Sequence, residues 1–390
     1  MSDAPPFDLQ AIPALDHHCH NWRRLDAPFE RDQYRLLFTE AADPRVAPDI
    51  ATSVYYRWVI RELARVFECP NREDEVLAAR AELGHEAVAQ RLMSESNLNG
   101  AIIDFGFAGR GSDLYSVEEM SEPLGGVPTW GALRLETVLE ELVIEHDTAD
   151  AVEEAYLARL DAAALRAEGI VCLKSIIAYR TGLDLNPTSR AESYSSFTAL
   201  KQTAKDQGRV RIADKTFLDY FIGLALSWAS GERFPVQFHT GFGDPTVDLK
   251  TGNPIALRPV LEHPAYRDVP IVLLHAGWPY VRESSYLANV YPNVYTDSGL
   301  AIPFAASEYA TIWQQLLSLA PTSKILWSSD GFVLPEHCWF AARHGRAALA
   351  TALGDLVELG AIGADDVPVI ATDILHGNAE RLYAIEGSTT

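Results

Sequence analysis

The stretch Leu15-Asp16-His17-His18-Cys19-His20-Asn21-Trp22 decides how the rest of the chain is interpreted. A run of mostly apolar residues from Ala11 to Leu15 leads into it and predicts a short β-strand. Successive side chains of a strand point to opposite faces, so His18 and His20 are expected to point the same way from its C-terminal end. Two imidazoles in that arrangement could bind one divalent metal ion.

Three later apolar runs end in a residue type that could complete such a site. They are Phe234-Pro-Val-Gln-Phe-His239, Val269-Pro-Ile-Val-Leu-Leu-His275 and Lys324-Ile-Leu-Trp-Ser-Ser-Asp330. A carboxylate beside an activated water can act as a general base, and a histidine close to the ion can polarise a substrate carbonyl. We predict these catalytic roles for Asp330 and His275. The full predicted ligand set for Zn²⁺ or a similar ion, as one ion or two, is His18, His20, His239, His275 and Asp330.

A single histidine after a strand is more often a structural or surface residue than a metal ligand. Four histidines and an aspartate gathered at the ends of successive apolar runs are much harder to reach by chance. Six other histidines lack this context and are expected to be structural or exposed: His17, His85, His146, His263, His337 and His344.

Charge and composition restrict the class of protein. The 390 residues are 48% hydrophobic, enough for a large core, and carry a net charge of −22. That charge argues against nucleic acid or an anionic membrane as a partner, since both need a basic face. No stretch approaches the ~20 apolar residues of a membrane helix, the N-terminus lacks a secretion signal, and the four cysteines form no CxxC pair. We expect a cytoplasmic homo-oligomer that acts on a small molecule.

Apolar runs alternate with helical segments along the whole chain. The first β-run leads into the histidine stretch, and seven more are expected at 100–107, 130–138, 170–174, 234–239, 269–275, 292–297 and 324–329. Helices are expected at 53–67, 74–89, 148–168, 193–206 and 215–230. The helical block from about 29 to 97 is too long for a single connection between strands.

This alternation predicts an α/β protein, a (β/α)₈ TIM barrel with a helical insertion at about 29–97 after the first strand. A doubly wound sheet would also alternate, but it would carry a glycine-rich phosphate loop where this chain carries histidines. The barrel also accounts for the candidate ligands, because barrel active sites form at the C-terminal ends of the strands. We expect residues 1–390 to form this single barrel.

The motifs resemble those of a known family. Asp16-x-His18-x-His20, followed by single histidines and a final aspartate, resembles the amidohydrolase superfamily in its amidohydrolase 2 branch. The segment Ile374-Leu-His-Gly-Asn-Ala-Glu-Arg-Leu-Tyr383 is similar to the closing segment of that branch. The closer resemblance is to the amidohydrolase domain of FluG-like proteins, in which such a domain is fused to a glutamine-synthetase-like one. It rests on Leu173-Lys-Ser-Ile-Ile-Ala-Tyr-Arg-Thr-Gly-Leu-Asp184, Gln237-Phe-His-Thr-Gly-Phe-Gly-Asp244, Val272-Leu-Leu-His-Ala-Gly-Trp-Pro-Tyr280 and Asn293-Val-Tyr-Thr-Asp-Ser-Gly-Leu300.

The resemblance implies a metal-dependent barrel enzyme that hydrolyses a C–N or related bond, or that decarboxylates an acid. By position, His18, His20 and His239 would be metal ligands. His275 would be a ligand or a carbonyl polariser, and Asp330 a ligand and the general base. Our primary hypothesis is a hydrolase that activates water on a divalent metal to cleave an amide or related C–N bond of a small carboxylate-bearing substrate. The alternatives are a non-oxidative decarboxylase, a uronate-isomerase-like isomerase and a non-catalytic binding barrel.

Lys174 ends the fourth β-run, and its role has three interpretations. In binuclear members of the superfamily a lysine at that position is carboxylated and bridges two metals, so the resemblance implies Lys174 as a further ligand. An uncarboxylated Lys174 could instead bind a substrate carboxylate. The third interpretation is a buried lysine paired with an acidic neighbour.

Four residues are candidates for substrate binding. Tyr179 and Arg180 follow Lys174 closely and could share a substrate carboxylate with it. Arg134, at the end of the third β-run, could clamp a carboxylate with both arms of its guanidinium, or form a surface salt bridge. Trp278 comes directly after the sixth run and could line the pocket or pack within its own loop.

Overall fold

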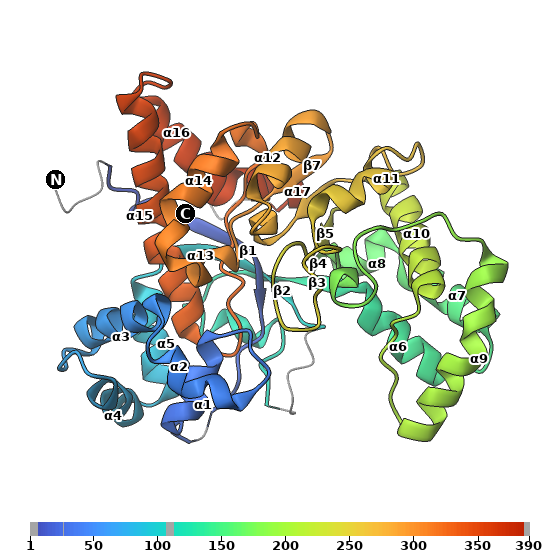
Figure 1. The fold of residues 1–390 in the computed structure, drawn as a ribbon, viewed down its shortest axis with the longest axis horizontal. Coiled ribbons are helices and arrows are strands. Elements are labelled where there is room, and N and C mark those ends of the chain that lie inside the picture. The colour runs from blue at the N-terminus through green and yellow to red at the C-terminus, as the bar shows by residue number, and fades with distance from the viewer. Residues whose placement is uncertain (1–6, 26, 107–112, 386–390) are drawn as a thin grey trace.

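The centre of the molecule is a parallel sheet (Figure 1). The computed structural model describes residues 7–25, 27–106 and 113–385, and in this part of the chain the sheet has seven strands. They are β1 (Ala14–His20), β2 (Leu98–Asp104), β3 (Thr129–Arg134), β4 (Ile170–Ser175), β5 (Val236–Phe238), β6 (Ile271–Leu273) and β7 (Val294–Thr296). Each strand pairs in parallel with the next one in the chain. Most of their residues are buried, as is typical of parallel strands that helices cover.

The eighth expected β-run, 324–329, is not a strand, so the prediction is wrong there. The segment nevertheless contacts both edges of the sheet. The backbone N–H of Leu326 donates to a carbonyl of β7 (2.8 Å), and that of Asp330 donates to a carbonyl of β1 (3.0 Å). Regular pairing is interrupted because the N–H of Ser329 donates to the side chain of Asp16 (2.9 Å). The curled sheet with this segment between β7 and β1 is TIM-barrel-like.

Helices surround the sheet (Figure 1). Between β1 and β2 lie α1 (Arg31–Arg35), α2 (Ala47–Ile50), α3 (Val54–Phe67), α4 (Glu73–Leu83) and α5 (His85–Ser94). Between β3 and β5 lie α6 (Leu135–Glu145), α7 (Ala149–Arg159), α8 (Ala162–Ala167), α9 (Arg190–Gln207) and α10 (Lys215–Glu232). The others are α11 (Arg258–Leu261), α12 (Val281–Val290), α13 (Ala301–Phe304), α14 (Tyr309–Leu317), α15 (Pro335–Glu358), α16 (Asp366–Thr372) and α17 (Asn378–Tyr383). Figure 1 places α3 and α4 at the opposite end of the molecule from α7 and α9.

Two expected helices are each split in two. The helix expected over 74–89 breaks at Gly84, whose φ of +79° separates α4 from α5. The helix expected over 148–168 becomes α7 and α8. It breaks because Asp161 leaves the helical conformation and its side chain accepts a backbone N–H in the first turn of α8 (2.7 Å).

Two expected strands have different bounds. The third β-run, expected over 130–138, ends at Arg134, where the apolar sequence continues directly into α6. The second, expected over 100–107, begins earlier and ends at Asp104. Residue 107 lies outside the described residues, as do the N-terminal residues 1–6 on which the argument about a secretion signal relied.

The segment expected to be a helical insertion, 29–97, contains α1 to α5. The first turn of α3 is capped by Ser53, whose side chain accepts the backbone N–H of Tyr56 (3.2 Å). In α4, the guanidinium of Arg80 forms an ion pair with Glu336 of α15 (2.6 Å), and both side chains are buried. A buried ion pair therefore joins this helical segment to α15.

His337 of α15 lies in an aromatic cluster that the helical segment shares. Its ring stacks on Phe332 (4.7 Å between centroids) and packs against Phe38 (4.9 Å). Its Nδ1 is hydrogen-bonded to the hydroxyl of Tyr55 in α3 (3.1 Å). Burial lowers the pKa of His337 to about 4. This histidine is a packing residue of the core, in line with the structural role expected from the sequence.

The free energy of unfolding is expected to fall when the pH is lowered through the titration range of His337. Its pKa of about 4 in the folded protein is below its ordinary value of 6.5, so the unfolded chain takes up the proton first. The stabilising contribution is complete above about pH 6.5 and is lost progressively towards pH 4, by roughly 3 kcal/mol. Urea unfolding at several pH values tests this: His337→Phe should flatten the dependence, and an unchanged slope would contradict the prediction.

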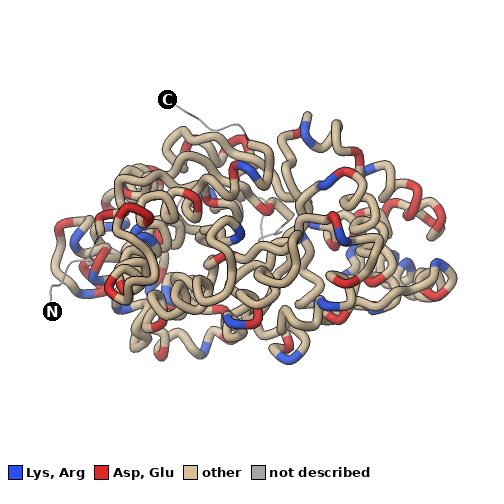
Figure 2. Tube along the Cα trace, turned by 90° about the horizontal axis from the view of Figure 1, so that it is seen from above, with Lys and Arg blue, Asp and Glu red and all other residues tan. Residues whose placement is uncertain are grey.

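Charged residues are dispersed over the molecule rather than gathered on one face of it (Figure 2). The sequence has 54 acidic and 32 basic residues, which give the net charge of −22, and the two kinds are interspersed along the trace. Of the helices that the structure describes, none combines the length and the apolar character needed to span a bilayer.

Candidate metal centre

His18 and His20 converge on one carboxylate at the C-terminal end of β1. Their Nε2 atoms each lie 3.2 Å from Oδ1 of Asp330, and all three side chains are buried. Burial lowers the pKa of His18 to about 3. Although burial opposes it, the neighbouring histidines hold the pKa of Asp330 well below its usual range. A neutral imidazole and an ionised carboxylate are the forms that bind a metal ion.

His275 faces the same carboxylate from the end of β6. Its buried Nδ1 lies 3.9 Å from Oδ2 of Asp330 and has no hydrogen-bond partner among the described residues. The backbone φ is +68° at His275 and +51° at Asp330, a region that residues other than glycine rarely adopt. At His275 this conformation is held by Asp297, whose carboxylate accepts its backbone N–H (2.6 Å). Strained backbone at two residues that face each other is typical of a functional site.

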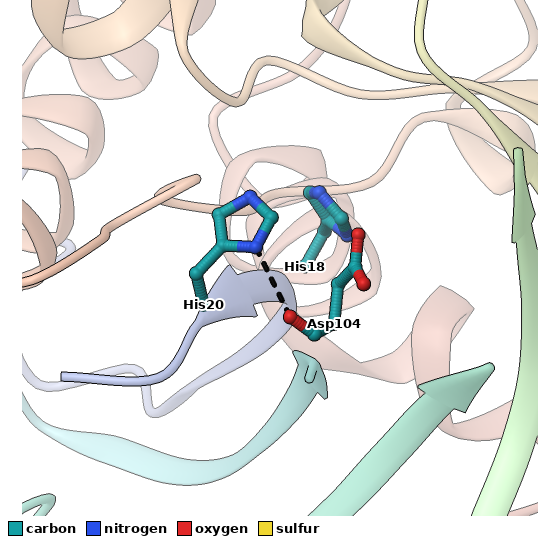
Figure 3. A group of neighbouring side chains, drawn as sticks. All are labelled: His18, His20 and Asp104. Atoms are coloured by element: carbon teal, nitrogen blue, oxygen red, sulfur yellow. Dashed lines mark hydrogen bonds between the residues drawn. The ribbon is translucent and has the colours of Figure 1, made fainter. Parts of the chain in front are cut away.

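Asp104 brings a second carboxylate to the histidines. Figure 3 shows His18 and His20 at the end of β1 and Asp104 at the end of β2, where Nδ1 of His20 lies 3.2 Å from the backbone carbonyl of Asp104. Two overlapping groups have ligand atoms within 4.8 Å of one another: His18, His20 and Asp104, and His18, His275 and Asp330. Asp104 was not among the residues predicted from the sequence, although it ends an apolar run as Asp330 does.

His239 reaches the same place from the end of β5 but does not converge on the carboxylate. Its ring lies 4.4 Å from that of His275, measured between centroids. Its Nε2 lies 3.0 Å from the backbone carbonyl of Phe242, and neither of the two ligand groups includes it. The structure thus places His239 beside the candidate centre, with one ring nitrogen engaged by the loop that follows β5.

Lys174 is buried near the end of β4, beside the first histidine. Its Nζ lies 3.0 Å from Nε2 of His18. Burial lowers the pKa of Lys174 to about 8, while the negative charges of Asp104 and Asp330 oppose the shift. A fraction of this lysine is therefore uncharged near neutral pH, which is the form that reacts with CO₂. Its position fits both a bridging carboxylated lysine and a direct contact with a ligand.

A buried polar network around Asp297 supports the backbone of His275. Asp297 accepts hydrogen bonds from Nε2 of His17 (3.1 Å) and from the hydroxyl of Ser328 (2.6 Å). The other ring nitrogen of His17 is hydrogen-bonded to the hydroxyl of Tyr383 in α17 (3.1 Å). Although burial opposes it, the contact with His17 lowers the pKa of Asp297 to about 2. His17 therefore supports the centre and does not point into it.

The candidate ligands open into a cavity of about 430 Å³. Its lining includes eight of the residues singled out in the sequence: His20, Arg134, Lys174, Tyr179, Arg180, His239, His275 and Asp330. Trp278 is not among the described lining residues, and its indole N–H donates to Glu308 (3.0 Å). The lining also contains Glu40, Glu140 and Arg211, which no sequence motif marks, and Asp244, which ends the motif that begins at Gln237.

Arg134 was predicted to bind a substrate carboxylate, but in the structure it binds the carboxylate of Asp104. Its Nε donates to Oδ1 and Oδ2 of Asp104 (both 3.1 Å), and its Nη2 donates to Oδ2 (2.6 Å). Arg180 forms an ion pair with Glu140 (3.1 Å), and its buried Nε has no hydrogen-bond partner within the described residues. Of the two arginines, Arg180 therefore has the donor left for a ligand.

The donor set suits a divalent metal ion. The Nε2 atoms of His18 and His20 each lie 3.2 Å from Oδ1 of Asp330, and the buried Nδ1 of His275 nearby has no hydrogen-bond partner among the described residues. Mixed nitrogen and oxygen ligands of this kind are typical of Zn²⁺ and related ions. A buried cluster of histidines and acids at the C-terminal ends of the strands is where a barrel enzyme would hold such an ion.

Comparison with known proteins relates the chain to the amidohydrolases. Residues 225–385 match the model of the amidohydrolase family, Amidohydro_2. The protein FluG of Emericella nidulans is 28% identical over 97% of this chain, which spans 46% of the length of FluG. A proposed metal-dependent hydrolase from Lactobacillus casei ATCC 334 is 29% identical, with a TM-score of 0.85 over 96% of each chain. The resemblance read from the motifs is confirmed.

Solved uronate isomerases share the fold. The enzyme from Thermotoga maritima has a TM-score of 0.64 at 14% identity, over 96% of this chain and 95% of its own. Glucuronate isomerase from Caulobacter crescentus has a TM-score of 0.62 at 15% identity, over 97% of this chain and 92% of its own. At such low identity the likeness concerns the fold alone.

Proposed function

We propose that the protein is a metal-dependent hydrolase that cleaves an amide or related C–N bond in a small carboxylate-bearing substrate. The observation that carries the proposal is the convergence of the two Nε2 atoms of His18 and His20 on Asp330 beside a cavity. The relationship to the amidohydrolase family supports it. A divalent ion held by these residues, most suitably Zn²⁺, would supply Lewis-acid chemistry to water and to a substrate carbonyl.

The residues around the candidate metal centre can carry out different steps of the hydrolysis. Asp330 is ionised in the folded protein, so its carboxylate can accept a proton from the attacking water and return it to the departing amine. His275 faces that carboxylate and can donate a hydrogen bond to the carbonyl oxygen of the substrate. Arg180 and Tyr179 line the cavity after β4, where a substrate carboxylate could bind.

The number of metal ions depends on Lys174. A carboxylated Lys174 would bridge two ions, whereas the free amine would leave a single ion and could contact the substrate. Anomalous scattering at the metal absorption edge distinguishes the two. Two peaks with extra density on Nζ support the bridge, and one peak with a bare Nζ supports the substrate contact.

The variant His18→Asn is expected to lose most of its bound metal. The substitution removes the one residue that both groups of potential ligands share. Changes outside the ligand shell already reduce metal affinity about 10–100-fold, so loss of a ligand should exceed about tenfold. Metal analysis after dialysis measures it. His146→Asn, changed just beyond the C-terminal end of α6, is the matched control. Full metal content and turnover in His18→Asn would exclude the proposed centre.

A substrate screen tests the reaction itself. N-acyl and γ-glutamyl amides are compared with aromatic and short-chain acids, and the release of amine and of CO₂ is recorded. Released amine supports the hydrolase. Release of CO₂ without amine would overturn it in favour of a decarboxylase.

A further inference from the structure

The cavity beside the candidate metal centre is lined by charges of both signs. Four of the lining residues are basic and four are acidic: Arg134, Lys174, Arg180 and Arg211, and Glu40, Glu140, Asp244 and Asp330. A cavity made for a simple anion would be expected to carry mainly basic groups. The ion pairs and hydrogen bonds of these eight side chains therefore indicate which charges a ligand would carry.

The basic side chains lie together and have partners. Burial lowers the pKa of Arg180, and the charge of Glu140 opposes this shift. The positive charges of Arg211 and Arg134 lie close enough to lower the pKa further. Arg211 donates from Nη2 to the backbone carbonyl of Tyr179 (2.9 Å). The unpaired Nε of Arg180 remains as a donor in this basic region, which we define as Arg134, Arg180 and Arg211.

Glu40 and Asp244 form a second, acidic region of the cavity. Within the described part of the chain, Glu40 has no hydrogen bond and no ion pair. Burial raises its pKa to about 8, with a further contribution from the negative charges of Asp330 and Asp244. No basic residue of the cavity offsets them. Asp244 is exposed, and its Oδ1 accepts from the backbone N–H and the hydroxyl of Thr246 (2.7 and 2.6 Å).

Tyr179 separates the two regions. Its backbone carbonyl holds Arg211, and its ring packs on His239 (4.2 Å between centroids). Its hydroxyl reaches the loop after β5, where a Cβ added to Gly243 would lie only 1.9 Å from it. Asp244 is the next residue. Arg211, at the backbone of Tyr179, and the acidic region, near its hydroxyl, thus lie towards opposite ends of this tyrosine, and His239 lies beside its ring.

We propose that the cavity recognises a dipolar ligand, whose carboxylate binds the basic region and whose ammonium group binds Glu40 and Asp244. An ammonium group would favour the ionised form of Glu40, which has only acidic groups acting on it, and a carboxylate would supply the acceptor that Arg180 Nε lacks among the described residues. The inference rests on the proposed function and names its substrate class: amides that carry a carboxylate at one end and an organic cation at the other.

Binding without turnover tests this proposal. Isothermal titration of the metal-loaded protein compares 5-aminovalerate with valerate, glutarate and 1,5-diaminopentane, which have similar chain lengths and differ in charge. We expect 5-aminovalerate to bind about tenfold more tightly than each of the other three, since one charge-assisted contact is worth about that factor. Equal or tighter binding of glutarate or diaminopentane would overturn the proposal. The series from 4-aminobutyrate to 8-aminooctanoate then gives the preferred spacing of the two charges.

Variants assign the two ends of the ligand. Glu40→Gln and Asp244→Asn should weaken 5-aminovalerate about tenfold in combination and leave valerate unchanged, whereas Arg180→Gln should weaken both. Asp248→Asn, an exposed position in the loop that carries Asp244, is the control. Unchanged binding in the double variant would refute the acidic region as a cation site. If dipolar binding is intact but no amide is cleaved, the proposed function fails and the dipolar site stands.

Discussion

Asp330→Asn is expected to lower kcat/KM for amide hydrolysis by about 10²–10⁴-fold, the range that a positioned general base contributes. Asparagine has nearly the same size, so the packing around the candidate centre should persist. It neither ionises nor accepts a proton at neutral pH. The wild-type carboxylate is ionised at neutral pH because the facing histidines hold its pKa well below the usual range although burial opposes this. Steady-state kinetics on an amide substrate measures the effect.

Metal analysis of the same variant separates the two roles of Asp330. If metal content stays near that of wild type while turnover is lost, the carboxylate acts chiefly as the base. If both are lost together, it acts chiefly as a ligand. Asp268→Asn removes an exposed carboxylate elsewhere on the molecule and should leave both measurements unchanged. Turnover by Asp330→Asn close to that of wild type would rule out the catalytic role altogether.

The core of the candidate centre could be predicted from the sequence because two simple rules apply to it. Strand alternation places His18 and His20 on one face, and a barrel gathers the C-terminal ends of its strands, so Asp330 and His275 come to the same place. Asp104 satisfies the same rule at the end of β2 and could also have been predicted.

Other parts depend on contacts that local sequence patterns do not contain. Glu40 lies in irregular chain between α1 and α2, and it reaches the cavity only because the helical segment packs against the rest of the fold. The run 324–329 reads as a strand, but the side chain of Asp16, far away in sequence, takes the backbone N–H of Ser329. Tertiary contacts of this kind override strand propensity.

Arg80→Met is expected to lower the free energy of unfolding by about 3–5 kcal/mol, because it leaves a buried charge without its partner. Nε of Arg80 in α4 donates to Glu336 at the start of α15 (2.6 Å). Tyr34 donates to the same carboxylate oxygen (3.2 Å), and the guanidinium lies over its ring (5.6 Å to the centroid). Although burial opposes it, Arg80 holds the pKa of Glu336 below its usual range. Urea unfolding at constant pH measures the loss.

Two further variants show whether the loss comes from the unpaired charge. Arg72→Ala breaks an exposed pair with Glu75 and should cost about 0–1 kcal/mol. The double variant Arg80→Met, Glu336→Met removes both buried charges and should recover much of the stability, since apolar groups of similar volume can replace a buried pair. A loss below about 1 kcal/mol in Arg80→Met would mean that the pair of Arg80 and Glu336 contributes little to holding the helices between β1 and β2 against α15. Glu40 reaches the cavity only if the helices between β1 and β2 stay packed against α15. Arg80→Met should therefore also weaken the binding of 5-aminovalerate.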